Sequence, residues 1–200
     1  MPMILRRATG FTLIELMVTL TVVFVLALLA VPSFLAVRQR AALRGAGDQV
    51  LSLWNQARFE AAKRNEMVKV GVHVDGTAFC FGAATTTDES DTTPCDCSTA
   101  APTTNACDVA RFPADQDEWR QVTLSGTPTL GNDNGVAVID PKFTALADPT
   151  AAGTVTLAGP PGRISYKLNL HVDTLGRGVL CESTADTKPM SDYIDRRCAP

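Results

Sequence analysis

Gly10-Phe11-Thr12-Leu13-Ile14-Glu15-Leu16 opens an apolar run that continues to Val31 and stops at Pro32. From Phe11 to Val31 the only charged residue is Glu15. About 20 apolar residues, at a rise of about 1.5 Å each, can cross the hydrocarbon core of a bilayer as a helix. The sequence therefore predicts a membrane-spanning helix over residues 11–31. A carboxylate facing lipid at depth costs at least about 2.5 kcal/mol, so Glu15 either stays hydrated near the interface or is paired for a functional reason.

The part of the chain after this run is acidic. Residues 66–200 carry 10 Lys or Arg and 18 Asp or Glu, a net charge of −8, whereas the whole chain has a net charge of −3. This length is sufficient for one globular domain. An acidic head of this kind argues against a surface that binds DNA without sequence preference.

All six cysteines lie in this head and none lies in the apolar run. If the run places the head in an oxidising compartment, an even number of cysteines predicts disulfides. Zinc is less favoured, because the local cluster supplies three sulfurs and no nearby histidine. Spacing does not fix the pairing, and our one expectation is Cys181 with Cys198. The disulfide candidates are Cys80, Cys95, Cys97, Cys107, Cys181 and Cys198.

A second apolar stripe follows Pro32 at helical spacing, with polar residues on the opposite side. We therefore expect residues 32–65 to continue the helix in amphipathic form and to end near Asn65. The stripe is expected to be core, packed against a sheet. Its members are Leu43, Gly47, Val50, Trp54, Ala57 and Ala61.

The sequence of the head predicts a series of strands. Residues 68–74 alternate Val with other residues, and Asp75-Gly76 precedes a second strand at 77–81, which predicts a hairpin with a two-residue turn. Turns rich in Gly and Pro separate further expected strands at 120–124, 136–139, 154–157, 163–172 and 178–181. A long helix followed by antiparallel strands is an α+β arrangement.

Residues 82–118 are expected to form a long polar loop that the cysteines tie down. Its acidic runs, 88–91 and 115–118, do not have the ligand spacing of an EF-hand, so a solvated loop is favoured over a calcium site. The only histidines are His73 and His171, and no nucleophile with a neighbouring base or phosphate-binding loop is evident. We therefore predict that the protein is not an enzyme and has no cofactor or metal.

Arg6-Arg7-Ala8-Thr9-Gly10, followed by the Phe11 and Glu15 spacing, resembles the class III signal of type IV pilins and type II secretion pseudopilins. The resemblance implies a leader at 1–10, cleavage between Gly10 and Phe11 by prepilin peptidase, and N-methylation of Phe11. It also implies that Glu15 pairs with the terminal amine of a neighbouring subunit and that Pro32 marks a kink or melted turn. An ordinary secretory signal, with small residues at 27, 30 and 33, remains an alternative.

Residues 56–65, Gln-Ala-Arg-Phe-Glu-Ala-Ala-Lys-Arg-Asn, resemble the end of the long helix in FimT and FimU minor pilins and GspH pseudopilins, with Phe59 where a Ser is usual. Gly176-Arg177-Gly178-Val179 stands where FimT-like proteins carry a DNA-binding Gly-Arg-x-Arg motif, but Val179 replaces the second Arg. The possible DNA contacts are Arg163, Lys167, Arg177, Arg196 and Arg197.

The resemblance implies a pilin-like fold and a minor pilin that initiates or caps a type IV pilus. A GspH-like pseudopilin of the type II secretion system is the first alternative, and a DNA-binding tip pilin for uptake is the second. Other pilins or pseudopilins, prepilin peptidase and the inner membrane would be its partners. The cysteines and the resemblance place the head, 66–200, in the periplasm, and in the filament it would lie at the cell surface. Arginines flank both ends of the apolar run, so the positive-inside rule does not decide this orientation.

Overall fold

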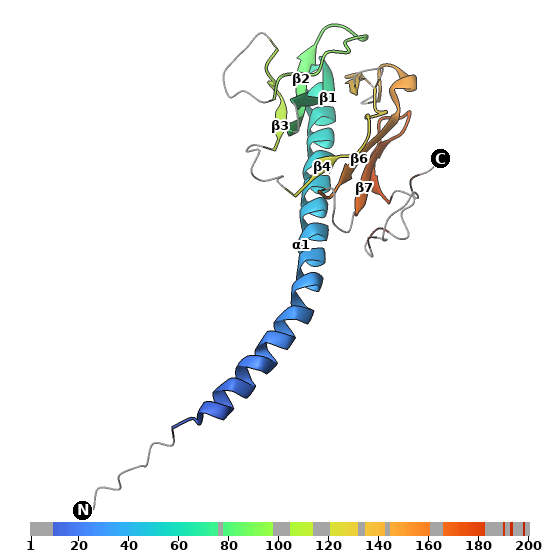
Figure 1. The fold of residues 1–200 in the computed structure, drawn as a ribbon. Helices are drawn as coiled ribbons and strands as arrows, with labels where there is room; N and C mark the ends of the chain where they lie inside the picture. The colour runs from blue at the N-terminus through green and yellow to red at the C-terminus, as the bar shows by residue number, and fades with distance from the viewer. Residues whose placement is uncertain are drawn as a thin grey trace, which may run out of the picture. The chain divides into compact units, whose positions relative to one another are not determined.

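The structure is a computed structural model that describes residues 10–75, 78–97, 105–113, 121–131, 135–142, 145–160, 166–182, 190, 193 and 198, with the side chains of 29–33 and 75 left out. The chain divides into two compact units, Met1–Arg38 and Gln39–Pro200. Helix α1 (Leu13–Arg64) contributes residues to both units (Figure 1). Our predicted division at residues 32 and 66 therefore differs from the compact units, because the end of α1 packs as part of the head.

Helix α1 is continuous through Pro32. Proline lacks the backbone N–H that would bond the preceding turn, and in a helix interior it costs about 3 kcal/mol. The resemblance implied a kink or a melted turn at Pro32; a melted turn is not seen in this structure, and a kink stays a prediction. The helix ends as the sequence predicts: Asn65 has a φ of 55°, and the N–H of Glu66 bonds the carbonyl of Ala61, which is the bond pattern of a left-handed C-terminal cap.

The head contains two four-stranded antiparallel sheets (Figure 1). The first has the order β3-β2-β1-β5, with β1 (Met67–Asp75), β2 (Ala78–Thr86), β3 (Ala110–Phe112) and β5 (Val136–Ile139). The second has the order β4-β6-β7-β8, with β4 (Thr123–Leu124), β6 (Gly153–Ala158), β7 (Lys167–Val172) and β8 (Gly178–Cys181). A short 3-10 helix, η2 (Pro149–Ala151), precedes β6. The predicted α+β class is confirmed.

The core of the head forms around the second half of α1. Every member of the predicted stripe is buried, and Leu43, Trp54, Ala57 and Ala61 have no exposed surface. The indole N–H of Trp54 donates to the carbonyl of Gly176, beside β8, while the Gln56 amide reaches the carbonyl of Val109, beside β3. In Figure 1 the two sheets lie on either side of this part of the helix. The helix therefore serves as the common core element of both sheets.

Strand β2 is longer than predicted. Residues 82–86, which we assigned to the long loop, pair with β1 as far as Thr86 opposite Met67. Their composition, rich in Gly, Ala and Thr, suggested a loop, but small residues are required here because disulfides pack directly over the strand. Gly82 is the clearest case: a Cβ at this position would overlap the sulfurs of Cys95 and Cys107.

Other boundaries of the strands also shift. Asp75, which we expected in the hairpin turn, is the last residue of β1 and pairs with Ala78, while residues 76 and 77 lie outside the described residues. The strand expected at 120–124 is confined to Thr123–Leu124 in the described part, and the one expected at 163–172 begins at Lys167, with 163–165 outside the described residues. The strands at 136–139 and 178–181 are confirmed. The strand expected at 154–157 extends by one residue at each end.

The alternation of β1 predicts only part of its burial. Val68, Val70 and Val72 are buried as expected, whereas Val74 is exposed, beyond the Val68–Gly71 stretch with which β5 pairs. The opposite face is not simply solvated. Lys69 is only 7% exposed, and Pro94 of the disulfide-tied loop lies within 3.4 Å of the Cβ position of Gly71. This loop therefore covers the second face of the sheet.

Candidate functional site

The N-terminal unit begins with a capped helix. The hydroxyl of Thr12 accepts a hydrogen bond from the backbone N–H of Glu15 at 3.3 Å, and α1 starts at Leu13. This is an N-cap, which satisfies one of the free N–H groups of the first turn. Our sequence reading missed this role of Thr12, although Thr followed three residues later by Glu is a signal for it. The cap fixes the start of the helix at Leu13, two residues after Phe11.

Glu15 lies in the first turn of α1 and is exposed. Among the described residues, its carboxylate has no hydrogen-bond or ion-pair partner. A negative charge in this position interacts favourably with the positive end of the helix dipole, by about 0.3 to 1 kcal/mol at an exposed site. The carboxylate is therefore compatible with its own helix and is available to a cation from outside the chain.

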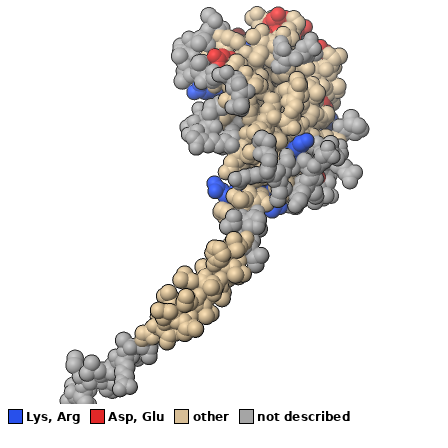
Figure 2. Space-filling model, in the orientation of Figure 1, with Lys and Arg blue, Asp and Glu red and all other residues tan. Residues whose placement is uncertain are grey.

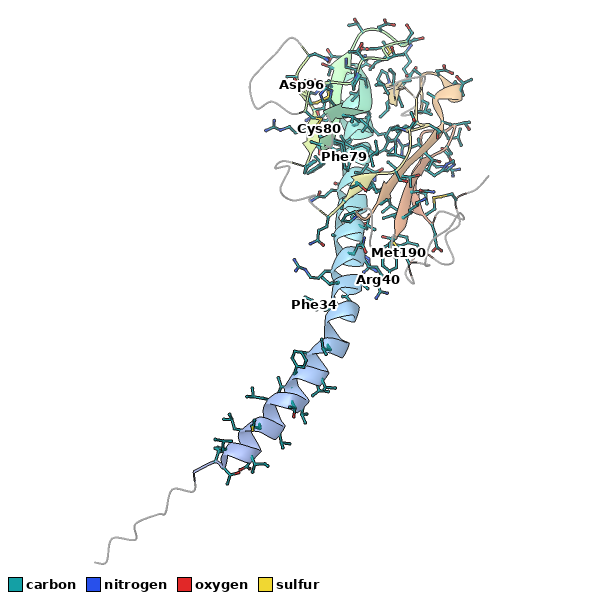
Figure 3. The ribbon with its side chains drawn as sticks, in the orientation of Figure 1. Phe34, Arg40, Phe79, Cys80, Asp96 and Met190 are labelled. Atoms are coloured by element: carbon teal, nitrogen blue, oxygen red, sulfur yellow. A yellow bond between two sulfur atoms is a disulfide. The ribbon has the colours of Figure 1, made fainter. Side chains whose placement is uncertain are left out.

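The apolar side chains of the N-terminal unit point outward. Those of Phe11, Leu13, Ile14 and most of the large apolar residues up to Leu28 are between 53% and 84% exposed, and Figure 3 shows them projecting from the helix on several sides. Single exposed apolar residues are ordinary, but a continuous surface of them marks a protein or membrane contact. Within the described part of the chain, no helix meets the combined length and apolarity needed to span a membrane.

Comparison with known proteins finds a match in this same N-terminal segment. Residues 5–31 match the prokaryotic N-terminal methylation motif. The match supports a type IV pilin-like or pseudopilin protein, and such proteins are structural and membrane-anchored, are processed by prepilin peptidase and assemble with other pilins. The match does not extend into the head. No curated protein and no solved structure matches the chain.

Three disulfides use all six predicted cysteines. They join Cys80 to Cys97, Cys95 to Cys107 and Cys181 to Cys198. The expected Cys181–Cys198 pair is confirmed. The first two pairs hold the segment after β2 against the first sheet, and Figure 3 shows Cys80 and Asp96 in this region. The segment after β2 has few large apolar side chains, and its buried disulfides take their place in packing against the sheet.

A buried ion pair completes the attachment of that segment. The ammonium of Lys69 in β1 lies 2.9 Å from a carboxylate oxygen of Asp91 and 3.3 Å from the amide oxygen of Asn105. Partial burial by itself would raise the pKa of Asp91, but the hydrogen bonds from Lys69, the Thr93 N–H and the Thr86 hydroxyl outweigh it and lower that pKa. Asp91 is therefore a structural partner of Lys69, whereas we had expected a solvated acidic run at 88–91.

The predicted DNA contacts are only partly placed. Arg163, Arg196 and Arg197 lie outside the described residues. Lys167 begins β7 and Arg177 follows the turn at the other end of that strand, so at about 3.3 Å per residue they are separated by about 20 Å. On the face shown in Figure 2, the described Lys and Arg side chains are scattered and do not form one patch. The described residues thus do not bring Lys167 and Arg177 together.

Arg177 forms an ion pair within its own turn. Its Nε donates to a carboxylate oxygen of Asp173 at 2.7 Å, and its backbone N–H donates to the other oxygen at 2.8 Å. Partial burial would raise the pKa of Asp173, but these bonds and the charge of Arg177 outweigh it and lower that pKa. The chain turns between β7 and β8 as the strand boundaries predict: Gly176 has a φ of 72° and β8 begins at Gly178.

Arginines near the boundary between the units contact aromatic rings within their own unit. In the first unit, the guanidinium of Arg38 lies 5.9 Å from the ring centroid of Phe34. In the second, the guanidinium of Arg40 lies 5.6 Å from that of Tyr166. Cation–π contacts of this kind are worth about 0.5 to 1 kcal/mol at exposed sites. These positive charges therefore have a packing role in addition to any role in membrane topology.

The head also has an open pocket of about 640 Å³ beside the end of α1. It contains the side chains of one acidic residue, three threonines and an asparagine, and no histidine, cysteine or lysine. Such a lining offers hydrogen bonds but no nucleophile paired with a base. Its residues are Asn65, Glu66, Met67, Thr85, Thr86, Thr87 and Pro141. The described residues hold no group of three or more His, Cys, Asp or Glu side chains that could bind a metal ion.

Proposed function

We propose that the chain is a minor pilin of a type IV pilus, a subunit that initiates or caps filament assembly. The observation that carries this proposal is the N-terminal methylation motif at residues 5–31, with Gly10, Phe11 and Glu15 at the spacing of the class III signal. The resemblance of residues 56–65 to the FimT, FimU and GspH group supports the finer assignment. Cleavage after Gly10 would leave Phe11 as a new N-terminus, ready for methylation.

In this proposal residues 11–31 have two successive environments. Before assembly they cross the inner membrane, where their apolar side chains face lipid. In the filament the same side chains pack against the helices of neighbouring subunits. Both environments would cover the surface that is exposed in the isolated chain.

Glu15 would direct the transition between these environments. In a filament core of low effective dielectric, an unpaired carboxylate costs several kcal/mol, and pairing with the amine of a neighbouring Phe11 removes most of that cost. Only one axial register brings the two groups together. The free carboxylate of Glu15 in the described structure is consistent with a partner supplied by another subunit.

The head would lie in the periplasm. Three disulfides are characteristic of a domain that matures in an oxidising compartment, which the bacterial periplasm provides. Single-pass anchoring by residues 11–31 would store the subunit in the inner membrane until it enters the filament, where the head reaches the cell surface.

The test is a Glu15→Ala variant expressed in cells that assemble the filament. We expect a processed, membrane-held protein that is absent from sheared surface fibres, because the register-setting charge pair is lost. Asp48→Ala is the matched control, since Asp48 is an exposed acid on the second half of the same helix. Normal incorporation of Glu15→Ala would refute the role assigned to Glu15.

A pseudopilin of type II secretion has the same N-terminal motif and differs in its partners. Affinity purification from sheared fibres, with identification of the neighbouring subunits, separates the two assignments. DNA uptake is the second alternative. It predicts salt-dependent retardation of DNA by the purified protein, and the absence of retardation at low salt would exclude it.

A further inference from the structure

The turn between β7 and β8 is unusually well fixed for an exposed loop. Asp173 holds it from inside: one carboxylate oxygen accepts the backbone N–H groups of Leu175 and Arg177 at 3.0 and 2.8 Å, and the other accepts Nε of Arg177 at 2.7 Å. Two backbone bonds close the same turn, from the N–H of Asp173 to Arg177 and from the N–H of Gly176 to Asp173. The turn therefore loses little conformational entropy when it binds a partner.

The turn is also attached to the core of the head. The buried indole of Trp54 donates to the carbonyl of Gly176 at 2.9 Å. Gly176 adopts a left-handed φ of 72°, which residues with a Cβ rarely do. The hydrogen bond from Trp54 therefore fixes the orientation of the turn relative to helix α1.

This fixed turn presents apolar surface to solvent. Leu175, at its tip, is 60% exposed, and Val179, two residues beyond Arg177 on the edge strand β8, is 47% exposed. Besides these two, the large apolar side chains exposed in the described part of the head are Phe59 and Val74. Arginine is enriched among the residues that dominate binding energy at protein interfaces, and a preformed turn lowers the entropy cost of docking, so Arg177 and the apolar side chain of Leu175 beside it form a small preorganised contact surface.

The charge of the turn is suited to a carboxylate. Nε of Arg177 is occupied by Asp173, but the two terminal amino groups have no partner among the described residues, and the side chain is 68% exposed. A guanidinium presented in this way can bind a carboxylate through two parallel bonds. A nucleic-acid backbone is a poorer match, because its binding depends on several cations along the row of phosphates, and Lys167, the other predicted contact in the described part of the chain, is about 20 Å away.

We propose that the β7–β8 turn, residues 173–179, docks the head of another pilin-like subunit, which contributes an apolar pocket for Leu175 and a carboxylate for Arg177. This inference rests on the proposed function and adds a contact of the head to the contact made by Glu15. It assigns the turn to protein recognition, whereas the Gly-Arg-Gly-Val sequence had suggested DNA.

Photocrosslinking in cells that assemble the filament tests the contact. A benzophenone amino acid replaces Leu175 in the full chain, and Val74, an apolar residue of the same head that is 53% exposed, is the matched control position. We expect a crosslink from position 175, and none from position 74, to a protein that itself carries the N-terminal methylation motif. No crosslink at 175, equal crosslinks at both positions, a partner without that motif, or a nuclease-sensitive product would each overturn the proposal.

Substitution provides the second measurement. Leu175→Asp should reduce the amount of the subunit in sheared fibres by at least about tenfold relative to Val74→Asp, a difference of about 1.4 kcal/mol. Circular dichroism and resistance to protease verify that both variants fold. If Glu15→Ala is excluded from fibres while Leu175→Asp enters normally, the docking inference alone fails. If Glu15→Ala also enters normally, the assembly role in the proposed function fails.

Discussion

The two halves of helix α1 have opposite relations to their surroundings. From Leu13 to Leu28 the large apolar side chains are exposed, and no described residue of the chain covers them. From Gln39 to Arg64 the apolar stripe is buried against the two sheets, and Leu43, Leu53 and Trp54 have no exposed surface. Backbone geometry does not distinguish the halves, since both are α-helix. The difference shows that one half is buried by its own chain, whereas the apolar surface of the other half is left uncovered; in the proposed function, lipid or other subunits cover it.

Glu15 and Lys69 show the same contrast between a group left without a partner and a group buried by its own chain. Glu15, in the first half of the helix, has no side-chain partner among the described residues, whereas Lys69 in the head is buried and bonded to Asp91 and Asn105. An unpaired charge is tolerated only while water reaches it. The head therefore satisfies its buried charge internally, and Glu15 requires a partner as soon as its surroundings become apolar.

The largest expected effect on the free energy of unfolding comes from comparing a buried side chain in the second half of α1 with an exposed one in the first half. Trp54→Ala should destabilise the head by about 4 kcal/mol, because it leaves a cavity in the core and removes the bond to Gly176. Phe24→Ala, in the exposed half, should change the stability of the head by less than about 0.5 kcal/mol. Urea unfolding of detergent-solubilised protein, followed by circular dichroism, measures both. Equal effects of the two substitutions would contradict the division.

The next effect concerns the disulfides that replace an apolar core in the tied segment. Replacing Cys80 and Cys97 together with Ser should cost about 3 kcal/mol, since their bond closes a loop with a sequence separation of 17. Urea unfolding gives the change for the head, while retention of the protein in the membrane fraction should not change. A reduced membrane fraction for folded protein would show that the first half of α1 depends on the head.

The smallest of the three effects tests the internal ion pair. Asp91→Asn should cost about 2 kcal/mol at pH 7, because Lys69 remains buried without its carboxylate. The pKa of Asp91 is lowered in the folded protein, so its contribution is present above the pKa of the unfolded chain and is lost as the pH falls through the lower folded value. The difference from the natural chain should therefore shrink on acidification.

Unfolding free energies between pH 7 and pH 3 measure this dependence. Glu89→Gln is the control, because Glu89 is an exposed acid of the same segment with no partner among the described residues. A destabilisation by Asp91→Asn that stayed constant over this range would show that the charge of Asp91 is not its source.

The features that were predicted correctly are those decided by residues close together in the sequence. The helical period placed the stripe from Leu43 to Ala61 in the core, Asn65 marked the end of α1, and alternation identified the β1–β2 hairpin. The N-terminal motif required no tertiary information, because it is defined by fixed spacing within one segment. These features would be recognisable in any chain with the same local sequence.

Features that depend on distant partners were not predicted. Gly82 to Thr86 looked like the start of a loop because the sulfurs that cover Gly82 come from Cys95 and Cys107. The burial of Lys69 was not predicted, because its partners Asp91 and Asn105 come from a segment without secondary-structure signals. The ion pair of Arg177 could have been anticipated, since Asp173 lies four residues before it across a turn.

Gly82 sets a limit on how this protein can change over time. The position tolerates no side chain, because even a methyl group would occupy the space of two sulfurs. Exposed positions of the same segment, such as Glu89 and Thr93, carry no such restriction on side-chain size. The two disulfides beneath this region thus fix its backbone independently of the residues that face solvent, so the fold and the surface chemistry of the region can be altered separately.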